Sequence, residues 1–159
     1  MGADVTHPAP GAPPEVSSLA TMTASIDLLG ARYAAVAANQ GRRVEMIQEA
    51  RKMAKRLLAQ FYTETKVPPE KIVYLRDGVS EGQYDQVLQH EATAICDEAR
   101  RMGSSHIKLT VIIVRKRHHT SFFPVQGGER ENIAPGTLVD TGVTHPRGFD
   151  FCMPFFQSC

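Results

Sequence analysis

The spacing of apolar residues changes several times along this chain, and each change predicts a different element. Residues 16–27 and 32–39 alternate as extended segments do, and a turn at Leu29–Gly30 separates them. From Arg43 to Phe61 apolar residues recur at helical spacing while basic residues take the other positions. The sequence therefore predicts two strands and then a long amphipathic helix that ends before Pro68–Pro69.

A second strand–helix–strand series follows these prolines. Residues 71–75 have the composition of a buried strand, and Ser80 with Gln83 three positions later is a capping-box start for a helix. That helix is expected to stop near Gly103, before an apolar strand at 109–114. Weaker strand patterns follow at 137–140 and 149–152. This order predicts a layered α/β fold.

Composition limits the classes of function that are open to the chain. Its 159 residues can bury a core, and a net charge of only +1 means that any nucleic-acid surface must be local. Basic residues do cluster at 42–56 and 115–119, with an acidic stretch between them. Three cysteines without CxxC spacing indicate a reducing compartment, the cytoplasm or else the nucleus, and no apolar run or signal peptide indicates a membrane.

Two aspartates follow short apolar stretches. Asp4 lies in the segment MGADVTHP at the start of the chain, and Asp77 follows the apolar residues 72–75 in IVYLRDGVSEGQ. Two carboxylates at strand ends can hold two divalent cations against one phosphodiester. A strand-end aspartate by itself more often caps a turn, so local sequence leaves both interpretations open.

The flanking residues distinguish these interpretations. DVTHP at 4–8 and RDGVSEG at 76–82 resemble the two signature aspartate segments of the PIWI domain of eukaryotic Argonaute proteins. The resemblance implies an RNase H-like α/β fold, a mixed sheet flanked by helices. It also implies that Asp4 and Asp77 bind Mg²⁺ or Mn²⁺ ions, which cleave a target RNA paired with a small guide RNA. Silencing-complex proteins are further partners that the resemblance implies.

Glu45 is the third candidate ligand. It lies at the predicted start of the long helix, where an acid complements the helix dipole, and local sequence alone favours that role. The resemblance instead implies a glutamate that enters the metal site from a loop, with Glu49 near enough to leave the register open. His7 is interpreted as structural.

A basic block follows the strand at 109–114. Lys116, Arg117 and His118 suit several backbone phosphates, although a solvated charged turn is the alternative. The resemblance implies that these residues hold the guide strand and that His145 adds a secondary phosphate contact. Ser121 stands where many relatives carry a further basic residue.

The resemblance weakens at both ends of the chain. Relatives have a longer strand before Asp4, so we expect a sheet without its central strand that poorly covers Val111, Ile112, Ile113 and Phe123. Residues 152–159 resemble nothing in the family, and the segment carrying its fourth metal ligand is not found. We therefore expect a partial PIWI domain at 1–151, with a divergent tail, that does not cleave RNA by itself. The alternatives are a non-cleaving guide-dependent RNA-binding module, another RNase H-like nuclease, or an inactive fragment.

Overall fold

The chain forms two compact units. The computed structural model describes residues 1–116, 120–125, 133–145 and 148–153, and the units are Met1–Lys116 and Arg117–Cys159. In the described part of the second unit, Val139 and Cys152 form an isolated antiparallel bridge, with N–O distances of 2.9 and 2.8 Å. This bridge lies where the sequence predicted two weak strands. The predicted domain boundary at residue 151 stays a prediction.

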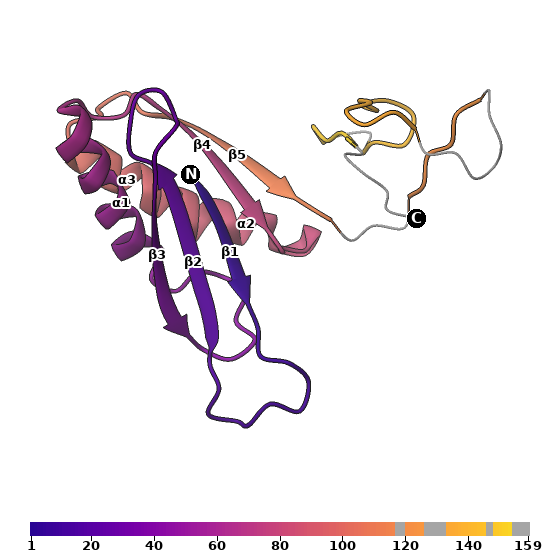
Figure 1. Ribbon diagram of the computed structural model, residues 1–159, viewed down its shortest axis with the longest axis horizontal. Helices are drawn as coiled ribbons and strands as arrows, with labels where there is room; N and C mark the ends of the chain where they lie inside the picture. The colour runs from indigo at the N-terminus through magenta and orange to yellow at the C-terminus, as the bar shows by residue number, and fades with distance from the viewer. Residues whose placement is uncertain (117–119, 126–132, 146–147, 154–159) are drawn as a thin grey trace. The chain divides into compact units, whose positions relative to one another are not determined.

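The first unit is built on a mixed sheet with the order β3-β2-β1-β4-β5 (Figure 1). Its strands are β1 (Gly2–Thr6), β2 (Ser18–Ser25), β3 (Tyr33–Gln40), β4 (Lys71–Asp77) and β5 (Lys108–Val114). β1, β2 and β3 pair antiparallel, whereas β1, β4 and β5 pair parallel. The two patterns meet at β1, which is the central strand.

β1 begins at the chain terminus and is nevertheless well paired. The Met1 ammonium donates to the Val73 carbonyl at 2.7 Å, and the Leu75 amide donates to the Met1 carbonyl at 2.9 Å. Since β1 also pairs with β2 along its whole length, the expectation that the sheet lacks its central strand is wrong. Asp4 therefore lies on a strand with hydrogen-bonded neighbours on both sides.

Helices α1 (Ala50–Thr65) and α3 (Thr93–Arg101) cover one face of the sheet (Figure 1). The chain reaches α3 through a 3₁₀ turn η1 (Glu81–Gln83), α2 (Tyr84–Gln86) and the π-helical η2 (Val87–Ala92). The Ser80 amide donates to Gln83 Oε1 at 3.1 Å, as the predicted capping box requires. Among the described residues, no helix is long and apolar enough to cross a membrane.

Residues 41–49 are irregular, so the prediction that the long helix starts near Arg43 is wrong. The Gln40 side-chain amide donates to the carbonyls of Val44 at 2.5 Å and Met46 at 3.1 Å. These contacts take carbonyl oxygens that the first helical turn would need, and α1 begins only at Ala50. Glu45 consequently lies on a loop.

Only one face of β4 is buried. Ile72, Tyr74 and Arg76 point toward the helices, whereas Val73 and Leu75 on the other face are 50% and 45% exposed. The prediction of a buried strand therefore holds for alternate residues only, as expected when helices cover a single side.

The apolar strand β5 is better covered than the sequence predicted. Val111 and Ile113 pack against the buried core, and Ile112 is partly buried. Phe123, in the second unit, is 61% exposed, which agrees with the expectation for that residue.

Candidate active site

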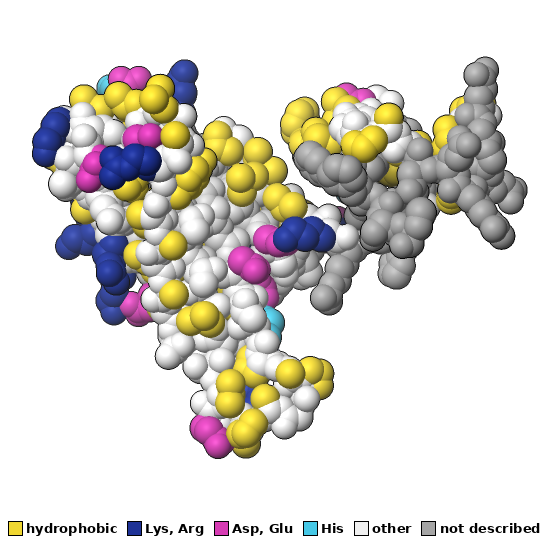
Figure 2. Space-filling view, viewed as in Figure 1, with side chains coloured by type: hydrophobic (Ala, Val, Ile, Leu, Met, Phe, Trp, Pro, Cys, Tyr) yellow, Lys and Arg dark blue, Asp and Glu magenta, His cyan; other side chains and the backbone are white. Residues whose placement is uncertain are grey.

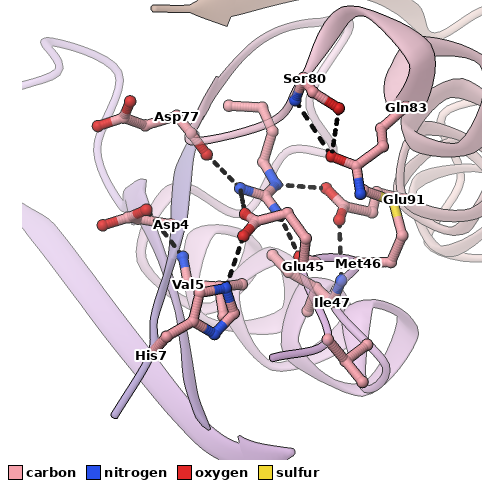
Figure 3. A network of polar contacts seen from close by, with 12 residues as sticks. Asp4, Val5, His7, Glu45, Met46, Ile47, Asp77, Ser80, Gln83 and Glu91 are labelled. Atoms are coloured by element: carbon pink, nitrogen blue, oxygen red, sulfur yellow. Dashed lines mark hydrogen bonds and ion pairs between the residues drawn. The ribbon is translucent and has the colours of Figure 1, made fainter. Parts of the chain in front are cut away.

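The central strands bring the two aspartates to the same level of the sheet. Ala3 on β1 lies opposite Arg76 on β4 in parallel register, so the next residues on each strand, Asp4 and Asp77, lie side by side. Figure 3 shows the two carboxylates close to one another. This placement is the one that the sequence predicted, while their role as metal ligands stays a prediction.

Glu45 approaches the aspartates from the loop before α1. A Cβ atom added to Gly78 would lie 3.2 Å from Glu45 Oε1 and 3.5 Å from Asp4 Oδ1, so both carboxylates border this glycine. Gly78 has a φ of +87°, a backbone conformation that residues other than glycine rarely adopt. It makes the turn directly after Asp77 and leaves open the space that the Asp4 and Glu45 carboxylates border.

Two side chains hold the Glu45 carboxylate (Figure 3). Arg76 Nη1 donates to Glu45 Oε1 at 3.1 Å, and His7 Nε2 lies 2.8 Å from Glu45 Oε2. The other imidazole nitrogen, Nδ1, lies 2.8 Å from the hydroxyl of Ser18. His7 was interpreted as structural, and its contact with Glu45 makes it part of the site. In the sequence, its position only three residues after Asp4 could have indicated that His7 lies near the site.

Behind Glu45 lies a buried polar network centred on Glu91. Its carboxylate accepts hydrogen bonds from Arg76 Nε at 3.0 Å, the Tyr74 hydroxyl at 2.6 Å and the Ile47 amide at 2.9 Å. Burial and then the charge of Glu91 raise the pKa of Tyr74 far above its usual range. Burial lowers the pKa of the Arg76 guanidinium, but the charge of Glu91, its hydrogen bond to Arg76 and the charges of Tyr74 and Glu45 together raise that pKa above its usual value.

Sequence reasoning missed Glu91. It lies in η2, in the middle of a helical pattern, where nothing in its neighbours distinguishes it from a surface acid. The side chain is fully buried, and π-helical turns are frequent at functional sites.

Lys116 lies next to Asp77, with its Nζ 2.6 Å from Asp77 Oδ2. The hydrogen bond to Asp77 and the charge of Asp77 raise the pKa of this lysine, desolvation lowers it, and the charge of Asp4 adds a further increase. In Figure 2 acidic side chains gather at the ends of β1 and β4 beside one basic group. Lys116 is thus the predicted phosphate contact that the structure places at the carboxylates.

The other predicted phosphate contacts are placed differently. Arg117 and His118 lie outside the described residues. His145 belongs to the second unit, where its backbone amide donates to Asp150 Oδ1 at 2.9 Å.

The sequence matches the Piwi domain family over residues 1–157. Argonaute 3 of rice, Oryza sativa subsp. japonica, is 40% identical over 156 residues, which cover 95% of this chain and 14% of the rice protein. The chain belongs to the Argonaute PIWI family.

Solved structures confirm the RNase H-like fold of this PIWI domain. Kluyveromyces polysporus Argonaute, crystallised with a guide RNA, matches with a TM-score of 0.82 at 27% identity, over 99% of this chain and 20% of that one. The C-terminal lobe of a budding yeast Argonaute matches with a TM-score of 0.81 at 28% identity, over 99% and 34%. Drosophila Piwi matches with a TM-score of 0.75 at 26% identity, over 99% and 21%.

The carboxylates of this PIWI domain fit a divalent cation in their donor chemistry. Mg²⁺ and Mn²⁺ prefer carboxylate oxygens, and Gly78 leaves room between Asp4 and Glu45. In the described part of the chain, however, no three His, Cys, Asp or Glu side chains are grouped closely enough to hold one ion. Glu45 is engaged by Arg76 and His7, and Asp77 is engaged by Lys116. A cation would therefore bind after some of these contacts rearrange.

Proposed function

We propose that this PIWI domain binds a small guide RNA and its paired target RNA, and that the full-length protein cleaves the target. Asp4, Glu45 and Asp77 would be the ligands of two Mg²⁺ or Mn²⁺ ions. The proposal is carried by the placement of Asp4, which lies beside Asp77 on the neighbouring strand and borders Gly78 together with Glu45. The matched Kluyveromyces polysporus Argonaute was crystallised with a guide RNA, which supports the guide as a partner. The chain spans 14% of the length of rice Argonaute 3, so activity is proposed for the whole protein.

The chain's own residues would prepare this site. Bound divalent ions supply a water of lowered pKa and stabilise the leaving oxygen. Arg76 and His7 fix the Glu45 carboxylate from two sides, so it is oriented before any ion arrives. Asp4 and Asp77 are set by the parallel pairing of β1 and β4, which is more rigid than two loops would be.

Replacement of Asp77 tests the proposed chemistry. In the full-length protein, Asp77→Ala should abolish cleavage of a guide-matched target and leave guide binding largely intact. Asp85→Ala is the matched control, because Asp85 is an exposed aspartate on α2. Cleavage that persists at the wild-type rate in Asp77→Ala would remove this residue from the catalytic set.

The proposed phosphate contacts are Lys116, Arg117, His118 and His145. A Lys116→Ala/Arg117→Ala variant should bind all guide sequences more weakly and reduce the slope of log K against log salt by about 0.7 per lost contact with single-stranded RNA. Lys55→Ala/Arg56→Ala removes the same two charges from the exposed side of α1 and is the control. Equal slopes in both variants would support a solvated turn.

A non-cleaving guide-dependent RNA-binding module is the second candidate. It is favoured by the ammonium of Lys116, which takes the place beside Asp77 that a cation would need. This function predicts that the wild-type protein retains guide and target in Mg²⁺ or Mn²⁺ without producing cleavage products.

A further inference from the structure

The strand register places the end of β5, and so Lys116 just after it, beside Asp77. Asp77, the last residue of β4, lies opposite Val114 on β5. Lys116 follows two positions later, just past the end of β5. Its Nζ lies 2.6 Å from Asp77 Oδ2.

This ammonium interacts with both aspartates of the proposed metal site. The hydrogen bond and the charge of Asp77 are the main reasons that the pKa of Lys116 is raised, and the charge of Asp4 contributes as well. In the part of the chain that the structure describes, Asp77 forms its ion pair with Lys116, whereas Glu45 pairs with Arg76 and His7. A single positive charge thus stands where the proposed function requires divalent ions.

The Lys116 side chain is free to leave this position. It is 75% exposed, whereas the side chain of Arg76 is 0% exposed. A lysine ammonium is a point charge on a flexible stem, so it can turn from a carboxylate to a phosphate without disturbing packed neighbours.

We propose that Lys116 is an exchangeable counter-ion of Asp77. In the RNA-free domain its ammonium balances the aspartates and competes with a divalent cation. A backbone phosphate of the RNA draws the ammonium away, and the cation then binds Asp77. This rests on the proposed metal and guide-RNA function. Because such coupling is reciprocal, RNA and the cation strengthen each other's binding.

Mn²⁺ titration without RNA tests the competition, with free Mn²⁺ measured by electron paramagnetic resonance on the full-length protein. Lys116→Gln should bind Mn²⁺ more tightly than wild type, by about 5-fold or more, as is typical of coupled sites. Lys116→Arg keeps the competing charge and should stay near wild type. Lys108→Gln removes an equal charge from the start of β5 and should also stay near wild type.

The same titration with a bound guide RNA tests the release. RNA should increase the Mn²⁺ affinity of wild type by several-fold, after subtraction of the Mn²⁺ that RNA binds alone. Lys116→Gln should show a much smaller increase, because its Asp77 is already free of the ammonium. An equal increase in both proteins would overturn the proposal.

Asp77→Asn separates this proposal from the proposed function. If Asp77→Asn loses Mn²⁺ binding while Lys116→Gln binds like wild type, the counter-ion role is wrong and the metal site remains. If wild type and every variant bind no Mn²⁺, or if Asp77→Asn binds as wild type does, both proposals are wrong.

Discussion

The two halves of the carboxylate site are held in opposite ways. The inner network (Glu45, Tyr74, Arg76 and Glu91) lies between the sheet and the helices, and the Arg76 and Glu91 side chains are both 0% exposed. The outer pair (Asp77 and Lys116) lies at the C-terminal ends of β4 and β5, and its side chains are 28% and 75% exposed. Similar functional groups therefore meet in two very different environments.

Because the two halves differ in exposure to solvent, we expect them to have different roles. Breaking a buried ion pair leaves a charge without compensation, whereas an exposed pair contributes little to stability and is screened by salt. The inner network therefore fixes the position of Glu45 as part of the fold. The outer pair can exchange its partner while the fold stays unchanged.

The largest expected effect comes from removing the centre of the inner network. Glu91→Ala should lower the free energy of unfolding by about 3–5 kcal/mol, because the buried Arg76 charge then loses its fully buried partner and keeps only Glu45. Tyr74 and the Ile47 amide also lose their acceptor. Chemical denaturation of the chain measures the loss.

The exposed Glu81, on η1, provides the control for this comparison. Glu81→Ala should change stability by less than about 0.5 kcal/mol. Equal losses in the two variants would show that the inner network does not stabilise the fold more than a surface acid does.

A smaller effect is expected for the hydroxyl of Tyr74. Tyr74→Phe removes the 2.6 Å hydrogen bond to the buried Glu91 carboxylate and should cost about 1–3 kcal/mol. Tyr62→Phe, on the half-exposed Tyr62 of α1, should be close to neutral and is the matched control. Chemical denaturation near neutral pH compares them.

The same substitution gives a pH test. Burial raises the pKa of Tyr74 above its unfolded value of about 10, so at higher pH the unfolded chain loses the phenolic proton while the folded chain keeps it. Tyr74 then contributes a fall in stability of about 1.4 kcal/mol per pH unit above pH ~10. This contribution should be absent in Tyr74→Phe, and an unchanged alkaline slope would contradict the burial of this hydroxyl.

Gly78 lies where the two halves meet, and a substitution there should have an intermediate to small effect. Gly78→Ala places a Cβ at φ +87° and 3.2 Å from Glu45 Oε1, so it should cost about 1–2 kcal/mol. Gly82→Ala meets no atom within 4 Å and serves as the control. Thermal unfolding of both variants would show the difference, and equal midpoints would contradict the close approach of Glu45 to Gly78.

The smallest effect on stability is expected for the outer pair. Lys116→Ala should leave the midpoint of chemical unfolding unchanged, because the ammonium is exposed to water and its pairing is offset by solvation. A loss as large as that of Glu91→Ala would remove the distinction between the two halves.

Much of the frame could be predicted from local sequence. The alternation in 16–27 and 32–39 predicted β2 and β3, and the serine–glutamine pair at Ser80 and Gln83 predicted the helical start that the structure shows. These signals are local, because strand alternation and capping depend on neighbouring residues. Residues 43–49 were predicted as helix but form a loop, because their contacts with Gln40 depend on how β3 ends.

The sequence by itself determined the family of the protein and the position of the two aspartates at the ends of their strands. The segments around Asp4 and Asp77 carry the family pattern, and a parallel pairing of their strands is enough to bring them together. Tertiary structure alone decided which charges meet. The Glu91–Arg76 pair spans 15 positions and the His7–Glu45 pair spans 38. Which charged side chains pair depends on strand register and on the exclusion of water. The neighbouring residues in the sequence indicate neither of these.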